Sequence, residues 1–211
     1  MCYRDDVWRG MVPLFSNRRI HLSKKERIHT RAITVNSYEM GDGTIQIEGI
    51  LTDERFCPFF YYSRNQFVDP GIVHKMTVHL DIALSDLEIK KARAVMSEVP
   101  MDSCREIEAF VQKLVGLKIK HGFTRKVRAL LGGVRGCLHL ANLILTMGSA
   151  AMQGYWTYHS RRREGAKGVR APEFDPELLK DSCWMWREEG PLFTRIKKLQ
   201  EEKKQTDETI E

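Results

Sequence analysis

The chain has 211 residues, of which 42% are hydrophobic. That is enough to bury the core of one domain with extensions, so disorder of the whole chain is excluded. The longest apolar stretch, residues 138–155, contains His139, Asn142 and Gln153 and therefore does not predict a membrane span. The N-terminus has no continuous apolar segment after a basic start, so no secretory signal is predicted and we expect a cytoplasmic protein.

The net charge of +6 is unevenly distributed along the chain. Eleven Lys and Arg residues lie between Gly116 and Arg170 against one acid, Glu164, whereas the remainder is net acidic. Such a concentration attracts anions, so the alternatives are a solvated basic face, an acidic protein partner or an anionic, phosphorylated small molecule. Nucleic acid is disfavoured, because the cations are not interleaved with aromatic residues and no helix-turn-helix or zinc-finger signature occurs.

The five cysteines are odd in number and widely scattered, in a chain for which no export signal is predicted. This pattern argues against a disulfide framework and for reduced thiols. Each thiol can then be a small buried hydrophobe, a metal ligand or a reactive group. The residues are Cys2, Cys57, Cys104, Cys137 and Cys183.

Two β-hairpins are predicted before residue 100, because apolar and polar residues alternate on both sides of two turns. The four strands are expected at residues 29–40, 44–51, 73–82 and 87–99. In the third strand Met76, Val78 and Leu80 fall on one face and His79 on the other. Residues 57–71 contain two prolines, a glycine and clustered aromatic rings, so we interpret them as a loop whose rings cover an edge of the core.

After Pro100 the apolar period changes from two to between three and four, which predicts helices. The first has Asp102 or Ser103 as its N-cap and ends at Gly116. The others are expected at 124–131 and from about 137 to 158. The fold class is therefore α+β: an antiparallel sheet of about four strands, followed by three helices packed on one face.

The organisation along the chain follows from these elements. Residues 28–160 are the predicted α+β core domain, preceded by an N-terminal arm at 1–27 and followed by a basic linker at 161–175. Residues 176–193 are expected to dock back through Trp184 and Trp186. Residues 194–211 form a charged tail, either a frayed helix or disordered.

Three Cys or His residues are expected where predicted elements begin: His74, Cys104 and Cys137. Thiols at helix N-termini feel the positive end of the helix dipole, which favours the thiolate that metal binding or nucleophilic attack needs. Neither a CxxC pair nor an HExxH motif occurs, so spacing alone does not define a zinc site. Cys137 is thus both a candidate metal ligand and a candidate catalytic thiol.

His139 is a further candidate ligand under one condition. Residues two apart on a regular helix point about 200° away from each other, so Cys137 and His139 share a metal only if Cys137 still lies outside the helix. The simpler alternative is a half-buried histidine that is hydrogen-bonded on the helix surface.

The segment "GGVRG" before the long helix has two interpretations. Its N–H groups and cation could bind an anion, through Gly132, Gly133, Arg135 and Gly136. It is neither GxGxxG nor GxxxxGK[ST] and it follows a helix, so no nucleotide fingerprint is present. A tight turn between two helices is the commoner explanation.

The order of several motifs resembles a known family. These motifs are "IHTRAITVNSYEMGDGTIQIEGILTDERF", "VHKMTVHLDI", "MDSC", "LVGLKIKHGFTRKVRALLGG", "GCLHLANLI" and "SCWMW". They resemble the bacterial family of domain of unknown function 2889 over most of residues 28–190. The family's usual Gly-Cys-Thr-His-Leu is here "GCLHL", and the segment after Cys183 is atypical. Membership implies a bacterial protein but no activity.

A more distant resemblance is to the scaffold proteins of iron–sulfur cluster assembly, the NifU- and IscU-like proteins. It rests on the order of strands and helices and on "GCLHLANLILTMGSAAMQGYW". The resemblance implies one ligand before a strand, one cysteine at a helix start and one at the start of the last long helix, here His74, Cys104 and Cys137. The scaffold's histidine falls on Gly136, so a fourth ligand would have to be His139 or an outside group.

Three hypotheses follow. The first is a metal-binding accessory or scaffold-like protein that holds Zn²⁺ or an iron–sulfur cluster. The second is a small-molecule-binding protein or enzyme that uses the Cys137 thiol and a basic pocket for an anionic or acyl-thioester ligand. The third is an interaction module with structural cysteines. Whether the protein is an enzyme stays open.

Overall fold

The structure is a computed structural model, and it describes residues 25–161 and 175–210. The chain divides into two compact units, Met1–Tyr158 and His159–Glu211.

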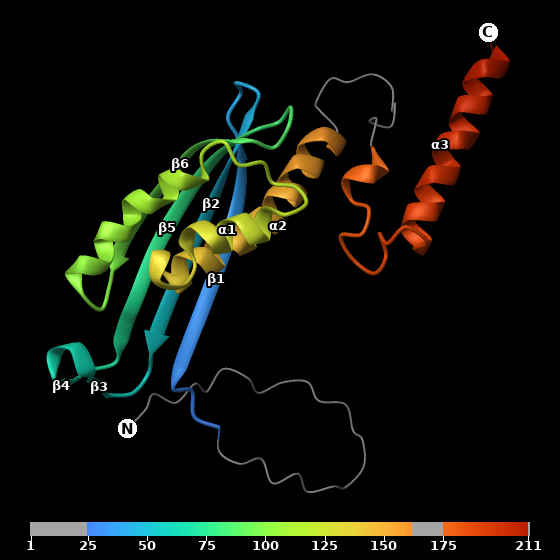
Figure 1. The fold of residues 1–211 in the computed structure, drawn as a ribbon. Coiled ribbons are helices and arrows are strands. Elements are labelled where there is room, and N and C mark those ends of the chain that lie inside the picture. The colour runs from blue at the N-terminus through green and yellow to red at the C-terminus, as the bar shows by residue number, and fades with distance from the viewer. Residues whose placement is uncertain (1–24, 162–174, 211) are drawn as a thin grey trace, which may run out of the picture. The chain divides into compact units, whose positions relative to one another are not determined.

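A four-stranded antiparallel sheet is the centre of the first unit (Figure 1). Its strands, in the spatial order β1-β2-β5-β6, are β1 (His29–Glu39), β2 (Thr44–Arg55), β5 (Gly71–Ala83) and β6 (Ile89–Glu98). Both predicted hairpins are confirmed, and the pairing of β2 with β5 joins them into one sheet. The register of β2 with β5 shifts between Asp53 and Glu54.

The sheet has one buried and one open face, because side chains alternate along each strand. Met76, Val78 and Leu80 are fully buried, whereas His79 on the opposite face is half-buried. On the open face His79 contacts Glu48, with 3.2 Å between Nε2 and Oε2. The alternation predicted for this strand is confirmed.

Three helical segments cover the buried face (Figure 1). They are η2 (Asp102–Leu114), α1 (Phe123–Leu131) and α2 (Leu138–Ser160), with the short turn η3 (Gly133–Arg135) between the last two. Their buried residues, among them Leu114, Leu131 and Ile144, form one core with sheet residues such as Leu51 and Met76. The predicted α+β fold is thereby confirmed.

Two helix starts differ from the prediction. The first segment is a 3₁₀ helix whose N-cap is Met101, and no side chain caps it, so neither Asp102 nor Ser103 has the predicted role. The long helix begins at Leu138, one residue later than predicted, and Cys137 precedes it.

The prediction of a loop at residues 57–71 was wrong. This segment contains a second, two-stranded sheet of β3 (Phe59–Tyr61) and β4 (Gln66–Val68), joined by the turn η1 (Tyr62–Arg64). Asn65 adopts the left-handed conformation that closes the turn, with φ 48°. Tyr62 and Phe67 are exposed and do not cover the core edge. A run of adjacent aromatic residues had hidden the two-residue alternation that marks a strand.

The second unit contains η4 (Pro176–Leu178) and α3 (Pro191–Ile210). Residues 194–211 were predicted to be either a frayed helix or disordered, and α3 makes residues 194–210 helical. Trp184 is exposed and carries the guanidinium of Arg187 over its ring, and docking of residues 176–193 stays a prediction.

Most of the predicted linker and arm, residues 162–174 and 1–24, lie outside the described residues. Across residues 25–161 and 175–210, none of the helices has the length and apolarity that a membrane crossing requires.

Candidate metal centre

A buried carboxylate lies near the end of β2. Asp53 lies on the same face of the sheet as Ile47 and Leu51, the face that the helices cover, and its exposed fraction is 3%. It is the one polar or charged residue that is buried in the described part of the chain. A buried charge needs partners, and the neighbouring strands supply them.

Arg31 and Asp53 are register partners in β1 and β2. The guanidinium donates two hydrogen bonds to the carboxylate, Nε to Oδ1 and Nη2 to Oδ2, each 2.7 Å long. His29, also on β1, places its Nε2 3.3 Å from Oδ1. The paired geometry fixes the plane of the carboxylate.

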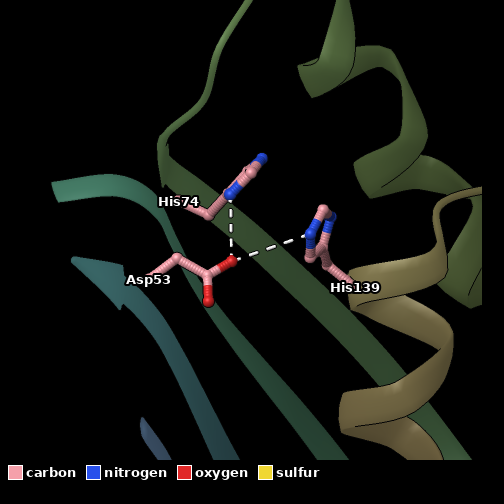
Figure 2. A group of neighbouring side chains, drawn as sticks. All are labelled: Asp53, His74 and His139. Carbon is pink, nitrogen blue, oxygen red and sulfur yellow. Dashed lines mark hydrogen bonds and ion pairs between the residues drawn. The ribbon is translucent and has the colours of Figure 1, made fainter. Parts of the chain in front are cut away.

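Two imidazole rings face the same carboxylate oxygen. His74, the register partner of Asp53 on β5, has its Nδ1 3.0 Å from Oδ2, and His139 in the first turn of α2 has its Nε2 3.6 Å from Oδ2. Figure 2 shows both rings converging on Asp53 from a strand and a helix. The ring centroids are 4.1 Å apart. We call Asp53, His74 and His139 the triad.

The charges in the triad set its protonation at neutral pH. Burial alone would raise the pKa of Asp53, but the hydrogen bonds and charge of Arg31, with smaller contributions from both histidines, lower it to about 2. Burial lowers the pKa of His74 and of His139, and for His139 the charges of His74 and Arg31 lower it further. An ionised carboxylate and two neutral imidazoles result, and these are the forms that bind metal ions.

Cys137 lies beside His139 but on the other side of its ring. Its carbonyl oxygen accepts a 2.9 Å hydrogen bond from the N–H of Ala141, so Cys137 is the capping residue of α2. Its Sγ is 3.7 Å from Nδ1 of His139, whereas Nε2 of the same ring faces Asp53. The late start of α2 therefore brings Cys137 and His139 together, as the sequence condition required.

The donor atoms of the triad all lie within 4.8 Å of one another. This grouping brings together His74 and His139, two of the four predicted ligands, and adds Asp53. Cys137 contacts His139 without joining the group. Cys104 lies in η2, half-buried against the core, and is not a member either.

Asp53 was not among the predicted ligands, because the candidates in the sequence were cysteines and histidines. A signal was present: Asp53 stands in the position that continues the buried alternation of Ile45, Ile47 and Leu51. A carboxylate on the core-facing side of a strand is costly unless it is paired, and it is therefore a site candidate.

The glycine loop forms a tight turn. A Cβ on Gly132 would lie 2.5 Å from the Arg128 carbonyl oxygen, and one on Gly136 would lie 2.4 Å from that of Leu131. Nε of Arg135 donates a 2.6 Å hydrogen bond to the carbonyl oxygen of Ala129 at the end of α1. These contacts account for the glycines and for Arg135 through the turn itself.

Fold and site together define an α+β protein with a candidate Asp–His–His metal centre at one end of its sheet. Residues 29–153, more than half of the chain, match the family described as "Protein of unknown function (DUF2889)", and the chain belongs to this family. No curated protein and no solved structure matches the chain. The family resemblance seen in the sequence is confirmed, and the resemblance to iron–sulfur scaffolds gains no support from these comparisons.

Proposed function

We propose that this protein is a metal-binding accessory protein and that the triad holds one divalent ion. The observation that carries the proposal is the convergence of a buried, ionised carboxylate oxygen and two neutral imidazole nitrogens within 4.8 Å. Each donor comes from a different element, β2, β5 or α2, so the fold itself sets their spacing.

The spacing of the donors suits a small ion. Bonds of about 2.0–2.2 Å in tetrahedral geometry put neighbouring donor atoms about 3.3–3.6 Å apart. The separation from Oδ2 of Asp53 to His139 is 3.6 Å, at the upper end of this range, and the separation to His74 is 3.0 Å, slightly below it. Three protein donors leave further positions for water or a ligand.

Two neighbours would support the ligands. A carboxylate oxygen has two lone pairs, so Arg31 can stay hydrogen-bonded to Asp53 while the side toward the imidazoles binds an ion. If Nε2 of His139 is the donor, its Nδ1–H faces the sulfur of Cys137 and can donate to it. Cys137 is then a partner that orients His139.

The donor set favours Zn²⁺ over an iron–sulfur cluster. Clusters are held mainly by cysteine thiolates, whereas the triad offers one carboxylate and two imidazoles. A mononuclear ion such as Zn²⁺, or Fe²⁺ by the same donor chemistry, fits this set. The scaffold hypothesis would need Cys104 and Cys137 to join His74, and we rank it below a mononuclear centre.

Equilibrium dialysis of the metal-stripped protein against Zn²⁺ tests the proposal. We expect about one Zn²⁺ per chain, and His74→Ala should weaken binding at least about 100-fold. His79→Ala is the matched control, because His79 lies on the opposite face of the same strand and contacts Glu48. Equal binding by His74→Ala and His79→Ala would overturn the proposal.

A second candidate function is favoured by one specific alignment. Sγ of Cys137 lies 3.7 Å from Nδ1 of His139, and Nε2 of His139 lies 3.6 Å from Oδ2 of Asp53. A thiol, an imidazole and a carboxylate in line are the parts of a cysteine nucleophile with an oriented base. In this alternative the protein is a thiol enzyme or binds an anionic or acyl-thioester ligand.

Alkylation separates the two candidates. If Cys137 is a nucleophile, iodoacetamide should modify it faster than the half-buried Cys104, and His139→Ala should remove the difference. If the triad holds zinc, Zn²⁺ should slow the modification of Cys137, whereas His74→Ala should abolish that protection. A Cys137 rate that neither His139→Ala nor Zn²⁺ changes would contradict the thiol candidate, and if dialysis also shows no Zn²⁺ binding, the third candidate, an interaction module with structural cysteines, is left.

An anionic partner for the basic region remains part of the proposal. Arg125, Lys126 and Arg128 are exposed on α1, and a shallow hollow of about 400 Å³ is lined by His121, Gly122, Thr124, Arg125 and Arg128. The chain has no Asp or Glu between residues 116 and 160. This charge supports an acidic protein or anionic small-molecule partner at α1. Arg125→Glu with Arg128→Glu should weaken such binding.

A further inference from the structure

The two outer edges of the four-stranded sheet differ in whether side chains hydrogen-bond to their outward backbone groups. At the β6 edge, side chains of η2 satisfy backbone groups: Oε1 of Glu108 accepts from the N–H of Met96, and Nε2 of Gln112 donates to the carbonyl oxygen of Ala92. Arg105 likewise donates to the carbonyl oxygen of Ser97. This edge is closed to another strand.

The opposite edge is β1, the outermost strand on the side away from β6 (Figure 1). Its hydrogen bonds to β2 can be assigned from its ends. The carbonyl oxygen of Ile28 accepts from the N–H of Phe56, and the N–H of Met40 donates to the carbonyl oxygen of Thr44. Because hydrogen-bonded pairs occur at every second residue of an antiparallel pair, the even-numbered residues of β1 are the ones that hydrogen-bond to β2. The odd-numbered residues therefore direct their N–H and C=O groups outward, away from β2.

Within the described residues, no side chain and no other strand hydrogen-bonds to the outward N–H and C=O groups of residues 29–38. The strand is long, at 11 residues, with no proline and no register shift against β2. Ile33, on the helix side of the sheet, remains 36% exposed. A long, regular edge without such interruptions is a template for pairing with another strand.

We propose that β1 pairs antiparallel with β1 of a second copy of this chain, about a two-fold axis at Thr34, to form a continuous eight-stranded sheet. Thr34 is the midpoint of His29–Glu39, so this register pairs the whole strand with itself. A two-fold axis makes both copies use the same surface, as in most homodimers.

This register sets compatible side chains and backbone groups of the two copies opposite one another. It sets each Ile33 opposite Val35 of the other copy, a pair of β-branched side chains that stabilises sheets. Odd residues then face odd residues, so the outward N–H and C=O groups of both strands meet as hydrogen-bonded pairs. At the two ends His29 lies opposite Glu39, and no like charges are opposed.

The interface between the two β1 strands, here called the seam, would run beside the candidate metal centre without depending on it. Arg31 and His29, which contact Asp53, belong to the pairing strand. Each seam end would bring Glu39 of the second copy to His29. The dimer rests on the edge of β1 alone, so its test is separate from metal binding.

Cross-linking tests the register. Residue 34 lies on the axis in a non-hydrogen-bonded pair, where opposite Cα atoms are about 4.5 Å apart and a disulfide can form. Thr34→Cys should yield a disulfide-linked dimer on mild oxidation. Ala32→Cys is the matched control on the same exposed face, because two residues 32 would be about 13 Å apart. Equal cross-linking of both variants and the unaltered chain would overturn this register.

Sedimentation of the full-length chain tests the dimer itself. We expect a dimer at tens of micromolar, converted to monomer by Ile33→Lys, which puts a charge into the seam, and retained by Ile33→Val. Circular dichroism should show both variants folded. A monomeric unaltered chain, or a dimer that Ile33→Lys leaves intact, would contradict the proposal; if Ile33→Lys fails to fold, the Thr34→Cys result decides.

Discussion

The guanidinium of Arg31 binds both oxygens of the buried Asp53 carboxylate across two paired strands, with 2.7 Å between each donor and acceptor. Arg31 is about one third exposed, whereas Asp53 is almost fully buried. The carboxylate therefore depends on Arg31 for its charge balance, and its free oxygen side is held toward the two histidines.

Removing only the cation should be costly. Arg31→Gln leaves the carboxylate of Asp53 buried without its main counter-charge, and we expect the free energy of unfolding to fall by about 3 kcal/mol. The double variant Arg31→Met with Asp53→Leu should recover most of that loss, because an apolar pair needs no counter-charge. Urea unfolding of the metal-free proteins measures both values. A loss below about 0.5 kcal/mol in Arg31→Gln would show that the pair is not important for stability.

Acid should remove the contribution of Asp53. Its pKa in the folded protein is about 2, below the ordinary value of 3.8, so folding favours the ionised form. The resulting stability, about 2 kcal/mol, is present above pH 4 and is lost as the pH falls toward 2. Measured in the presence of a chelator, the stability gap between the unaltered protein and Asp53→Asn should narrow over that range. A gap that stays constant from pH 5 to pH 2 would contradict this assignment.

Cys137 should modulate metal binding without being required for it. Cys137→Ala removes the sulfur that faces Nδ1 of His139, and we expect Zn²⁺ affinity to fall about 10-fold, in the range of orienting partners. Cys104→Ala, in η2, should leave the affinity unchanged. Complete loss of zinc in Cys137→Ala would instead make Cys137 a direct ligand, as the sequence first suggested.

The turn before α2 should tolerate a side chain at one glycine and not at another. A Cβ on Gly136 would lie 2.4 Å from a backbone oxygen, so Gly136→Ala must shift the chain that carries Cys137 and His139. Gly133 has φ 59° but open space around it, so Gly133→Ala should cost only about 1 kcal/mol. Gly136→Ala should lose more stability and also weaken Zn²⁺ binding. Equal effects of the two substitutions would mean that the turn does not position the site.

The sheet and helices were predictable because the periods of burial are simple. Met76, Val78 and Leu80 alternate with His79 in the sequence, and the structure buries them as that pattern requires. The hairpin at 59–68 was not predictable from periodicity, since its aromatic residues are adjacent and mostly outside the core.

The site was only half predictable. His74 was a candidate because it lies near the start of a strand, and His139 was one only on the condition that Cys137 lies outside the helix, yet both rings meet at Asp53, 21 residues before His74 in sequence. That contact exists because β2 and β5 pair in one particular register, which periodicity does not specify. The role of Cys137 depended on a helix start, and a shift of one residue there changes which side chains converge.

The most direct test of the metal centre is anomalous diffraction at the zinc edge from crystals of the full-length protein grown with Zn²⁺. The account predicts one strong peak per chain, about 2.0–2.2 Å from Oδ2 of Asp53, Nδ1 of His74 and Nε2 of His139. A zinc ion bound elsewhere, or an absence of zinc with Asp53 still bound by Arg31 and both histidines, would contradict it.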